Sequence, residues 1–267
     1  MKTILITGST DGLGLATATK LLELGHQVII HGRNEEKLAS VHESLLKISP
    51  QVSAYQADFS DLSSVLALAN TLKSDYASID VLINNAGVFK LNPASIDKDK
   101  VDPRLMVNTI APYVFTKALH SHLSDDARVI NLSSAAQAPF DLNGILGTKS
   151  YSNEMQAYAE SKLAITAWTL AMAKLENTKS QVFLAVNPGS LLATKMVKAG
   201  FGVEGNDISI GVNLLTDASL SESFKESNGK YFDNDKKAFA TPDSYATNES
   251  NQNKLIAVLD KIYTKLQ

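Results

Sequence analysis

The sequence predicts an α/β fold in which a doubly wound parallel sheet of about seven strands carries helices on both faces. Short apolar runs alternate with longer amphipathic segments through most of the chain. The short runs are apolar at successive positions, which is typical of parallel strands buried on both faces. Because right-handed crossovers join such strands, the alternation predicts a Rossmann-type sheet.

The expected strands are the apolar runs at residues 2–7, 27–31, 52–56, 81–84, 128–132 and 182–186, with a short one at 230–232. The expected helices are the amphipathic segments at residues 12–24, 35–48, 62–76, 103–123, 155–175, 208–218 and 251–266. Gly25 suits the end of the first helix and Asp61 the start of the third. No linker, repeat or low-complexity tract interrupts this order, so we expect a single domain over residues 1–267.

The composition is that of a globular protein with a large core, since 44% of the 267 residues are hydrophobic and 20% are charged. The formal net charge of −3 provides no basic field for nucleic acid or an anionic membrane surface. The absence of cysteine excludes a disulfide framework, a thiolate metal site and a cysteine nucleophile. The five histidines show no metal-ligand spacing, so we expect no catalytic metal.

The first apolar run, at residues 2–7, is too short for a signal peptide or a membrane span. No later segment is long and apolar enough to cross a bilayer. We therefore expect a cytoplasmic protein without a membrane anchor and without a nucleic-acid partner.

The turn after the first expected strand is rich in glycine and leads into a helix. It reads Thr7-Gly8-Ser9-Thr10-Asp11-Gly12-Leu13-Gly14. Glycines at such a turn allow the backbone to approach a pyrophosphate, and the helix N-terminus offers N–H groups to the anion. The Gly-x3-Gly-x-Gly spacing departs from the Gly-x-Gly-x-x-Gly fingerprint. We expect the residues from Gly8 to Gly14 to bind a dinucleotide; an ordinary glycine-rich turn is the alternative interpretation.

The end of the second expected strand indicates which dinucleotide binds. It reads His-Gly-Arg-Asn at residues 31–34 and lacks the acid that usually holds the ribose 2′-hydroxyl of NAD. Arg33 can form a bidentate pair with a 2′-phosphate, and Ser9 and Thr10 can add hydroxyl donors. We expect contacts from Arg33 and Asn34, and a preference for NADP(H) over NAD(H). The alternative is a solvated arginine paired with the glutamates that follow it.

Tyr158 and Lys162 lie four residues apart on the helix expected at residues 155–175, so their side chains share one face. A neighbouring ammonium favours the phenolate and lowers the pKa of the tyrosine. Alone, such a pair usually marks a solvated helix face. It becomes a candidate acid/base because polar strand ends precede it, at the edge where such sheets bind ligands. Tyr151 is a competitor, but Met155 rather than a lysine follows it by four residues.

Two strand ends are polar, Asn84-Asn85-Ala86-Gly87 and Asn131-Leu132-Ser133-Ser134. A hydroxyl of the serine doublet can hydrogen-bond to a substrate oxygen opposite the tyrosine, although ordinary turn chemistry is the alternative. Asn108 falls inside the helix expected at residues 103–123, where asparagine is a mediocre choice. This position hints at a specific polar role, with a locally bonded side chain as the alternative.

In this order the motifs resemble those of the short-chain dehydrogenase/reductase family. The resemblance runs from residue 2 to about residue 194 and is weaker beyond. Each motif is weak by itself, but the ordered set is specific. The set is Thr7-Gly8-x3-Gly12-x-Gly14, Asp58, Asn84-Asn85-Ala86-Gly87, Asn108, Ser134, Tyr158-x3-Lys162 and Pro188-Gly189.

The resemblance implies a role for each catalytic candidate. Tyr158 would be the general acid/base, and Lys162 would lower its pKa and hold the nicotinamide ribose hydroxyls. Ser134, at the second position of the serine doublet, would position and polarise the substrate oxygen. Asn108 would keep a water that links Lys162 to a proton relay. The further cofactor contacts implied, from the adenine to the nicotinamide end, are Asp58, Phe59, Asn85, Ala86, Gly87, Pro188, Gly189 and Thr194.

The C-terminal extension at residues 229–267, which begins Gly229-Lys230-Tyr231-Phe232, is similar to the retinol-dehydrogenase-like branch of the family. The long gap from Ser134 to Tyr158 narrows the subgroup further. Many members of that branch interconvert lipophilic carbonyls and alcohols with NADP(H). Thr194 stands one residue later than the family pattern, just before the expected substrate loop near residues 195–207.

We therefore expect an NADP(H)-dependent oxidoreductase that interconverts a carbonyl and an alcohol by hydride transfer, with Tyr158 as general acid/base. A sugar-nucleotide epimerase or dehydratase is one alternative, against which the glycine spacing argues. A catalytically silent, NADP(H)-sensing regulatory protein of the same fold is another, although a complete acid/base set is expected of an active enzyme. The helices with Asn108 and Tyr158 resemble those of the family's four-helix interfaces, so a homodimer or homotetramer is expected. Substrate specificity is expected in residues 135–151 and 195–207.

Overall fold

One sheet organises the computed structural model, which describes residues 1–91, 100–175 and 180–267. Within these residues, eight strands lie in the order β3-β2-β1-β4-β5-β6-β7-β8, and every neighbouring pair is parallel except β7 with β8. The strands are β1 Thr3–Ile6, β2 Gln27–Gly32, β3 Val52–Gln56, β4 Ile79–Asn84, β5 Leu123–Leu132, β6 Val182–Asn187, β7 Lys230–Asp233 and β8 Ala238–Ala240. The expected doubly wound fold is confirmed.

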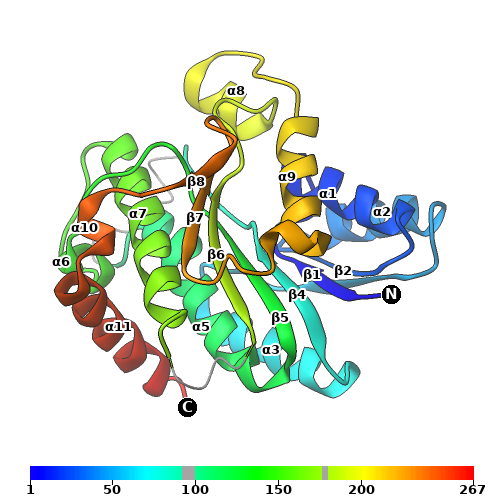
Figure 1. Cartoon of the computed structure of the whole chain (residues 1–267), viewed down its shortest axis with the longest axis horizontal. Helices are drawn as coiled ribbons and strands as arrows, with labels where there is room; N and C mark the ends of the chain where they lie inside the picture. Colours follow the sequence, from blue (N-terminus) through cyan, green and yellow to red (C-terminus); the bar gives the residue numbers. More distant parts are fainter. Residues whose placement is uncertain (92–99, 176–179) are drawn as a thin grey trace.

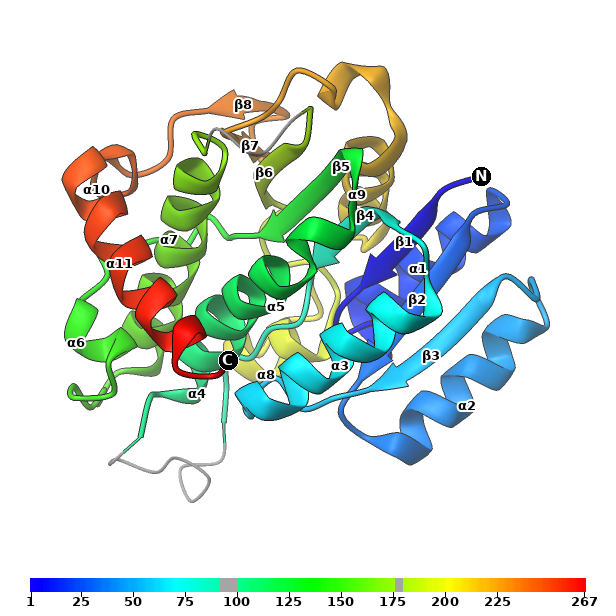
Figure 2. The same ribbon diagram turned by 90° about the horizontal axis from the view of Figure 1, so that it is seen from below.

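Helices cover both faces of the sheet (Figures 1 and 2). One layer consists of α1 Gly12–Glu23, α2 Glu35–Leu46 and α9 Ser209–Leu220. The other consists of α3 Leu62–Asp75, α5 Ala111–Leu119, α7 Glu154–Met172 and α11 Glu249–Thr264. Successive residues of β1 divide between the two cores: Ile4 and Ile6 pack under the first layer and Leu5 under the second. This division explains why the strands are apolar at every position.

The strand order reverses between β1 and β4, since the chain first builds outward through β2 and β3 and then in the opposite direction through β5 and β6. The carboxyl ends of these parallel strands meet at one edge of the sheet. A crevice outside the strand ends at such a reversal is the usual ligand site of this architecture.

The eighth strand was not expected. β8 has three residues, too few for a sequence pattern, and it returns antiparallel to β7 through a turn at Lys237, whose φ is 51°. Phe239 on β8 packs its ring against Phe224 and Phe232. The strand therefore depends on tertiary contacts of its aromatic side chain.

The prediction of a single regular helix at residues 103–123 is wrong. The segment comprises α4 Pro103–Leu105, a π-helical turn Met106–Ile110, α5 and a short 3-10 turn His120–His122. β5 then starts at Leu123, five residues before the expected start at Arg128, because Leu123 pairs with Ile79 ahead of a register irregularity.

The expected substrate loop near residues 195–207 is partly helical, since α8 Lys195–Phe201 occupies its first half. Two other short helices, α6 Leu142–Ile145 and α10 Ser244–Thr247, were also not expected. Along residues 1–91, 100–175 and 180–267, no helix combines the length and the apolar character needed to span a bilayer.

The terminal helix α11 packs against α7 and α5 (Figure 2). Leu255 and Leu259 are fully buried in this contact, and Asp260 accepts a hydrogen bond of 2.8 Å from the Tyr113 hydroxyl of α5. The C-terminal extension therefore covers part of the α5–α7 surface within the same chain.

Candidate active site

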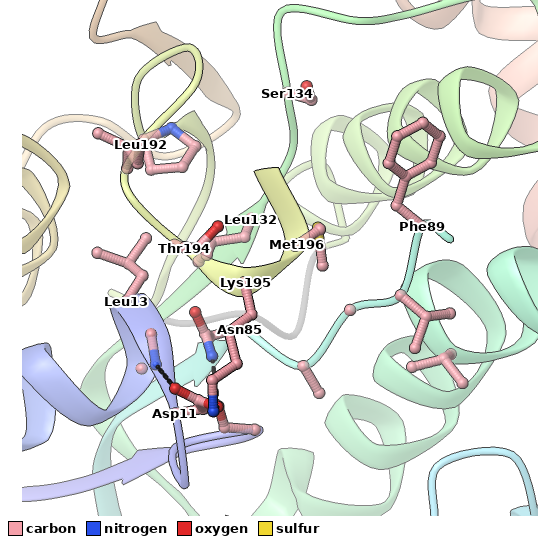
Figure 3. Close-up of a pocket in the computed structure, with 18 of the residues that line it drawn as sticks. Asp11, Leu13, Asn85, Phe89, Leu132, Ser134, Leu192, Thr194, Lys195 and Met196 are labelled. Atoms are coloured by element: carbon pink, nitrogen blue, oxygen red, sulfur yellow. Dashed lines mark hydrogen bonds and ion pairs between the residues drawn. The ribbon is translucent and has the colours of Figure 1, made fainter. Parts of the chain in front are cut away.

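A cavity of about 800 Å³ opens at the carboxyl edge of the sheet, with α8 above it (Figure 3). Its wall comes from the loop after β1, from the ends of β2 to β6, and from α7 and α8. It brings together most of the residues expected from the sequence to form one site. These are Gly8, Thr10, Asp11, Gly12, Leu13, Gly14, Arg33, Asp58, Phe59, Asn85, Ala86, Gly87, Ser134, Tyr158, Lys162, Pro188, Gly189 and Thr194.

The three glycines of the loop after β1 meet separate steric demands. Gly8 has a φ of +65°, and a Cβ there would lie 2.7 Å from the Cα of Ala86. Gly12 has a φ of +52° at the start of α1. A Cβ on Gly14 would lie 2.4 Å from Nδ2 of Asn85 and 2.6 Å from the carbonyl oxygen of Gly8. The loop is therefore a backbone cradle at a helix N-terminus, which fits the pyrophosphate of a dinucleotide.

Asn85 holds this loop to the end of β4. Its side-chain Nδ2 donates to the carbonyl oxygens of Thr7 and Gly8, at 2.8 and 3.0 Å. The backbone N–H groups of Asn85 and Ala86 both donate to Thr7 Oγ1 at 3.0 Å. The role of Asn85 in this structure is thus to shape the cradle from behind.

Ser9 and Asn34 lie outside the cavity wall, contrary to expectation. The Ser9 side chain is fully buried, donates to the carbonyl of Ile6 at 2.8 Å and accepts from the backbone N–H of His31 at 2.9 Å. Asn34 caps α2, where its side chain accepts from Lys37 N. Ser9 is therefore unsuited to donate to a 2′-phosphate, because its hydroxyl faces the protein interior.

Asp11 links three elements at the mouth of the cradle. Its carboxylate accepts from Gly12 N at 2.8 Å and forms ion pairs with Lys37 of α2 at 2.7 Å and Lys195 of α8 at 2.8 Å (Figure 3). Burial opposes ionisation, but the hydrogen bonds from Lys195, Lys37 and Gly12 N lower the pKa of Asp11 to about 2. The carboxylate is thus charged throughout the physiological range and connects α8 to the glycine loop.

The end of β2 presents two basic side chains to the cavity. Arg33 is exposed, and Lys37 follows one turn later on α2. Asp58, which also lines the cavity, accepts at 2.8 Å from both the backbone N–H and the hydroxyl of Ser60. Two cations in this part of the cavity suit an anionic group of a ligand.

His31 joins the glycine loop to the end of β3. Its Nδ1 accepts from Gly8 N at 3.1 Å, and Nε2, 3.0 Å from the carbonyl of Ala57, must then carry the proton. The ring packs on Phe59 with a centroid separation of 4.6 Å. Burial is the main cause that lowers the pKa of His31 to about 4, so the ring is neutral near pH 7.

Tyr158, Lys162 and Ser134 meet at the opposite part of the cavity. Tyr158 and Ser134 line this part together, and Lys162 Nζ lies 5.6 Å from the Tyr158 ring centroid. Lys162 Nζ is nearly buried and donates to the Leu132 carbonyl at 2.8 Å. The side chains of Tyr158 and Lys162 thus lie on the same face of α7, as their spacing predicts.

The pKa directions of this pair differ from the simple expectation. Burial raises the pKa of Tyr158, and the lowering contribution comes from the Ser134 side chain. Burial lowers the pKa of Lys162 to about 8. Lys162 therefore loses its proton at about pH 8. Tyr158 keeps its hydroxyl proton at neutral pH.

The two serines of the doublet have different surroundings. Ser133 is buried and shares its hydroxyl with Thr166 Oγ1 at 2.7 Å and the Lys162 carbonyl at 3.1 Å. Ser134 is only partly buried, and its Oγ accepts from Ala136 N at 3.1 Å while it contacts Tyr158. Ser133 thus fastens β5 to α7, and Ser134 presents its hydroxyl to the cavity.

Asn108 lies behind the cavity wall, on the π-helical turn. Its amide brackets the backbone of Val88, accepting from Val88 N at 2.8 Å and donating to Val88 O at 3.0 Å. It also lies 3.0 Å from Ser161 Oγ, to which it donates. A π turn often marks a functional site; here it directs Asn108 to the segment that follows Gly87.

Thr194 stands one residue later than the family pattern, and the segment before α8 accommodates that additional residue. Leu191 adopts a φ of 52°, an unusual conformation for a non-glycine residue, and Gly189 a φ of 125°. Thr194 still lines the cavity and caps α8, accepting from Val197 N at 3.2 Å. The extra residue is therefore absorbed before Thr194.

Tyr151, the competing tyrosine, has a different partner. Its hydroxyl donates to the buried carboxylate of Glu160 at 2.6 Å, and burial together with this bond raises its pKa. Glu160 also accepts from Lys149 Nζ and Asp141 N. This network fastens the loop at residues 135–151 to α7.

Some residues of the cavity wall were not predicted, among them His31, Lys37 and Phe89, whereas Lys195 and Met196 belong to the loop in which substrate specificity was expected. Lys37 had a local signal, since it stands in the first turn of the helix expected at residues 35–48, shortly after Arg33. His31 and Phe89 depend on contacts between distant segments and had none.

The chain is similar to known proteins in sequence and in fold. Residues 2–201 match a family model described as short chain dehydrogenase. Retinol dehydrogenase 12 of Bos taurus is 32% identical over 263 residues, which cover 90% of this chain and 80% of that protein. Retinol dehydrogenase 13 of Homo sapiens is 27% identical over 268 residues, which cover 91% of this chain and 79% of that protein.

Solved structures show the same architecture. A short chain dehydrogenase from Burkholderia cenocepacia in complex with NADP superimposes with a TM-score of 0.70 at 24% identity, covering 87% of this chain and 95% of that chain. The landomycin C-6 ketoreductase LanV with bound NADP and rabelomycin superimposes with a TM-score of 0.68 at 25% identity, covering 87% and 94%.

Proposed function

Because the chain belongs to the short-chain dehydrogenase/reductase family, in its retinol-dehydrogenase-like branch, and is an NAD(P)-dependent oxidoreductase, we propose a specific reaction for it. It interconverts a carbonyl and an alcohol with NADP(H), and Tyr158 is the general acid/base. The observation that carries this proposal is that Tyr158, Ser134 and Lys162 line one part of a cavity whose other end is a glycine cradle.

The residues of the site divide the work between the two ends of the cavity. Bound NADPH supplies the hydride that reduces the carbonyl carbon. Ser134 donates a hydrogen bond to the carbonyl oxygen, and Tyr158 transfers its hydroxyl proton to that oxygen as negative charge develops there. Lys162, on the same face as Tyr158, stabilises the phenolate that remains.

The preference for NADP(H) is part of the proposal. Gly8, Gly12 and Gly14 form the pyrophosphate cradle, and Arg33 with Lys37 faces the 2′-phosphate. No residue from 31 to 34 is acidic, so the usual partner of an NAD ribose is missing at the end of β2. Asp58 and Phe59 lie at the adenine end.

A screen of aldehydes and ketones, followed by NADPH absorbance, tests the reaction. We expect turnover with wild type and a loss of at least about a thousandfold in kcat/KM with Tyr158→Phe, since the proton donor is removed. NADPH binding, measured by fluorescence, should be retained in that variant. Full activity of Tyr158→Phe would refute the role of the tyrosine. NADPH binding without turnover on any carbonyl by wild type would favour a cofactor-sensing protein.

Three further expectations stay predictions: a cytoplasmic location, a single domain and a homo-oligomer. The eight strands of one sheet support the single domain. The covering of α5 and α7 by α11 means that a four-helix interface has to form around α11 or elsewhere. Light scattering of the purified protein would give the oligomeric state.

A further inference from the structure

Phe89 lies between the short helix α8 and the catalytic tyrosine. Its ring centroid is 4.9 Å from that of Tyr158, with an interplanar angle of 51°. On its other side, α8 approaches so closely that a Cβ on Gly200 would lie 2.5 Å from Cε1 of Phe89. The ring thus fills the space between the helix and the acid/base, and only 5% of Phe89 is exposed.

The backbone that carries Phe89 is held on both sides. Asn108 brackets Val88, the preceding residue, with two hydrogen bonds of 2.8 and 3.0 Å. The carbonyl of Phe89 accepts from Arg104 Nη1 at 3.2 Å. Arg104 is 1% exposed and forms a bidentate ion pair with the buried Asp102, at 3.0 and 2.9 Å. Buried side chains thus fix the position of the backbone from which the Phe89 ring projects.

The wall near Phe89 is apolar. Met196 and Val197 of α8, and Ala135 and Ala136 after Ser134, line the cavity with it. Figure 3 places Phe89 and Met196 toward the end that holds Ser134, whereas Asp11 and Leu13 lie at the opposite end. Lys195, the charged residue that begins α8, is directed to Asp11 in the glycine loop.

We propose that Phe89 is the specificity-determining residue of the site and that its ring, by filling the space between α8 and Tyr158, limits the size of the carbonyl substituent that can lie beside it. This proposal rests on the carbonyl–alcohol reaction proposed above. The substrates are uncharged aldehydes and ketones that have at least one compact substituent. The larger substituent lies away from Phe89, and the compact one lies against its ring.

Acetophenone and benzophenone test the proposal, because acetophenone has one compact substituent and benzophenone has none. Their dissociation constants with the protein–NADP⁺ complex are measured by calorimetry, for wild type and Phe89→Leu. Removal of ring bulk should lower the ratio of the benzophenone to the acetophenone constant about tenfold, the discrimination typical of one or two methylene groups in an apolar pocket. Gly200→Ala pushes in the opposite direction, since its Cβ meets the Phe89 ring, and should raise the ratio about threefold.

Phe224→Leu is the matched control. Phe224 is similarly buried, at 6% exposure, but packs with Phe232 and Phe239 on the other side of the sheet and is absent from the cavity wall. The ratio of the benzophenone to the acetophenone dissociation constant in Phe224→Leu should equal that of wild type. Retained NADP⁺ affinity shows that each variant is folded.

An unchanged ratio in Phe89→Leu, or no binding of either ketone to any of these NADP⁺ complexes, overturns the proposal. If the ratio changes as expected but wild type reduces no carbonyl with NADPH, the role of Phe89 stands and the proposed reaction fails.

Discussion

Ser134 and Tyr158 line the same part of the cavity, and the Ser134 side chain is the contribution that lowers the pKa of the tyrosine against the effect of burial. The adjacent Ser133 faces the opposite way, toward Thr166. One residue of register therefore separates a hydroxyl available to a substrate from a hydroxyl that joins β5 to α7.

Substitution of the two serines should have different consequences. Ser134→Ala removes a donor to the developing oxyanion, so kcat/KM for carbonyl reduction should fall about a hundredfold or more. Ser133→Ala should change kcat/KM much less and lower the free energy of unfolding by about 1 to 2 kcal/mol, because it leaves the buried Thr166 hydroxyl with one partner fewer. Steady-state kinetics and urea unfolding of both variants check this; equal kinetic losses would contradict it.

Arg33→Gln should weaken the binding of NADPH and leave the binding of NADH unchanged. In the proposed complex the guanidinium pairs with the 2′-phosphate that only NADPH has, and a charge-assisted bond of about 1.5 to 3 kcal/mol corresponds to a loss of about ten- to a hundredfold in affinity. Fluorescence titration with each cofactor measures the two dissociation constants. Arg33→Lys serves as the control and should recover part of the affinity, since the charge remains but the fork geometry is lost. A parallel loss for NADH would show that Arg33 does not read the phosphate.

The rate of carbonyl reduction should decrease as pH rises above about 8. Burial lowers the pKa of Lys162 from 10.5 to about 8, so the ammonium is charged below that pH and neutral above it. Loss of its charge removes the stabilisation of the phenolate that proton transfer leaves on Tyr158. A profile of kcat/KM against pH measures this. Lys162→Arg should move the decrease to higher pH, and a wild-type profile that stays flat to pH 10 would rule out this assignment.

His31 should make the protein sensitive to acid. Its pKa is about 4 in the folded chain, below the ordinary value of 6.5 that it regains on unfolding, so the unfolded chain binds the proton first as pH falls. Stability from this group is complete above pH 6.5 and is lost as pH falls toward 4. About 2 kcal/mol should disappear between pH 7 and pH 5. Urea unfolding at both pH values, with His31→Gln as the comparison, measures the contribution. The idea fails if the variant shows the same loss.

Much of the site could be predicted because its signals are local. Gly8, Gly12 and Gly14 belong to one turn, and Tyr158 and Lys162 belong to one helix face, so covalent spacing decides their relative position. The alternation of apolar and amphipathic segments likewise predicted the layers of the sheet, because burial on both faces leaves a continuous apolar run.

Other parts could not be predicted because they need contacts between distant segments. The π turn around Asn108 accompanies bonds to Val88, 20 residues away, and to Ser161, 53 residues away. The inward direction of Ser9 depends on His31 of the next strand. Neither contact leaves a pattern along the chain.

The sequence by itself determined the sheet, the glycine loop after its first strand and the shared helix face of Tyr158 and Lys162, because each follows from periodicity or from spacing within a single turn or helix. The tertiary structure alone decided that Phe89 meets Gly200 of α8 and Tyr158 of α7, that Asp11 connects α2 and α8 to the glycine loop, and that α11 covers α5 and α7. The physical reason is that these relationships arise from the packing of elements far apart in the chain, which local propensity does not encode.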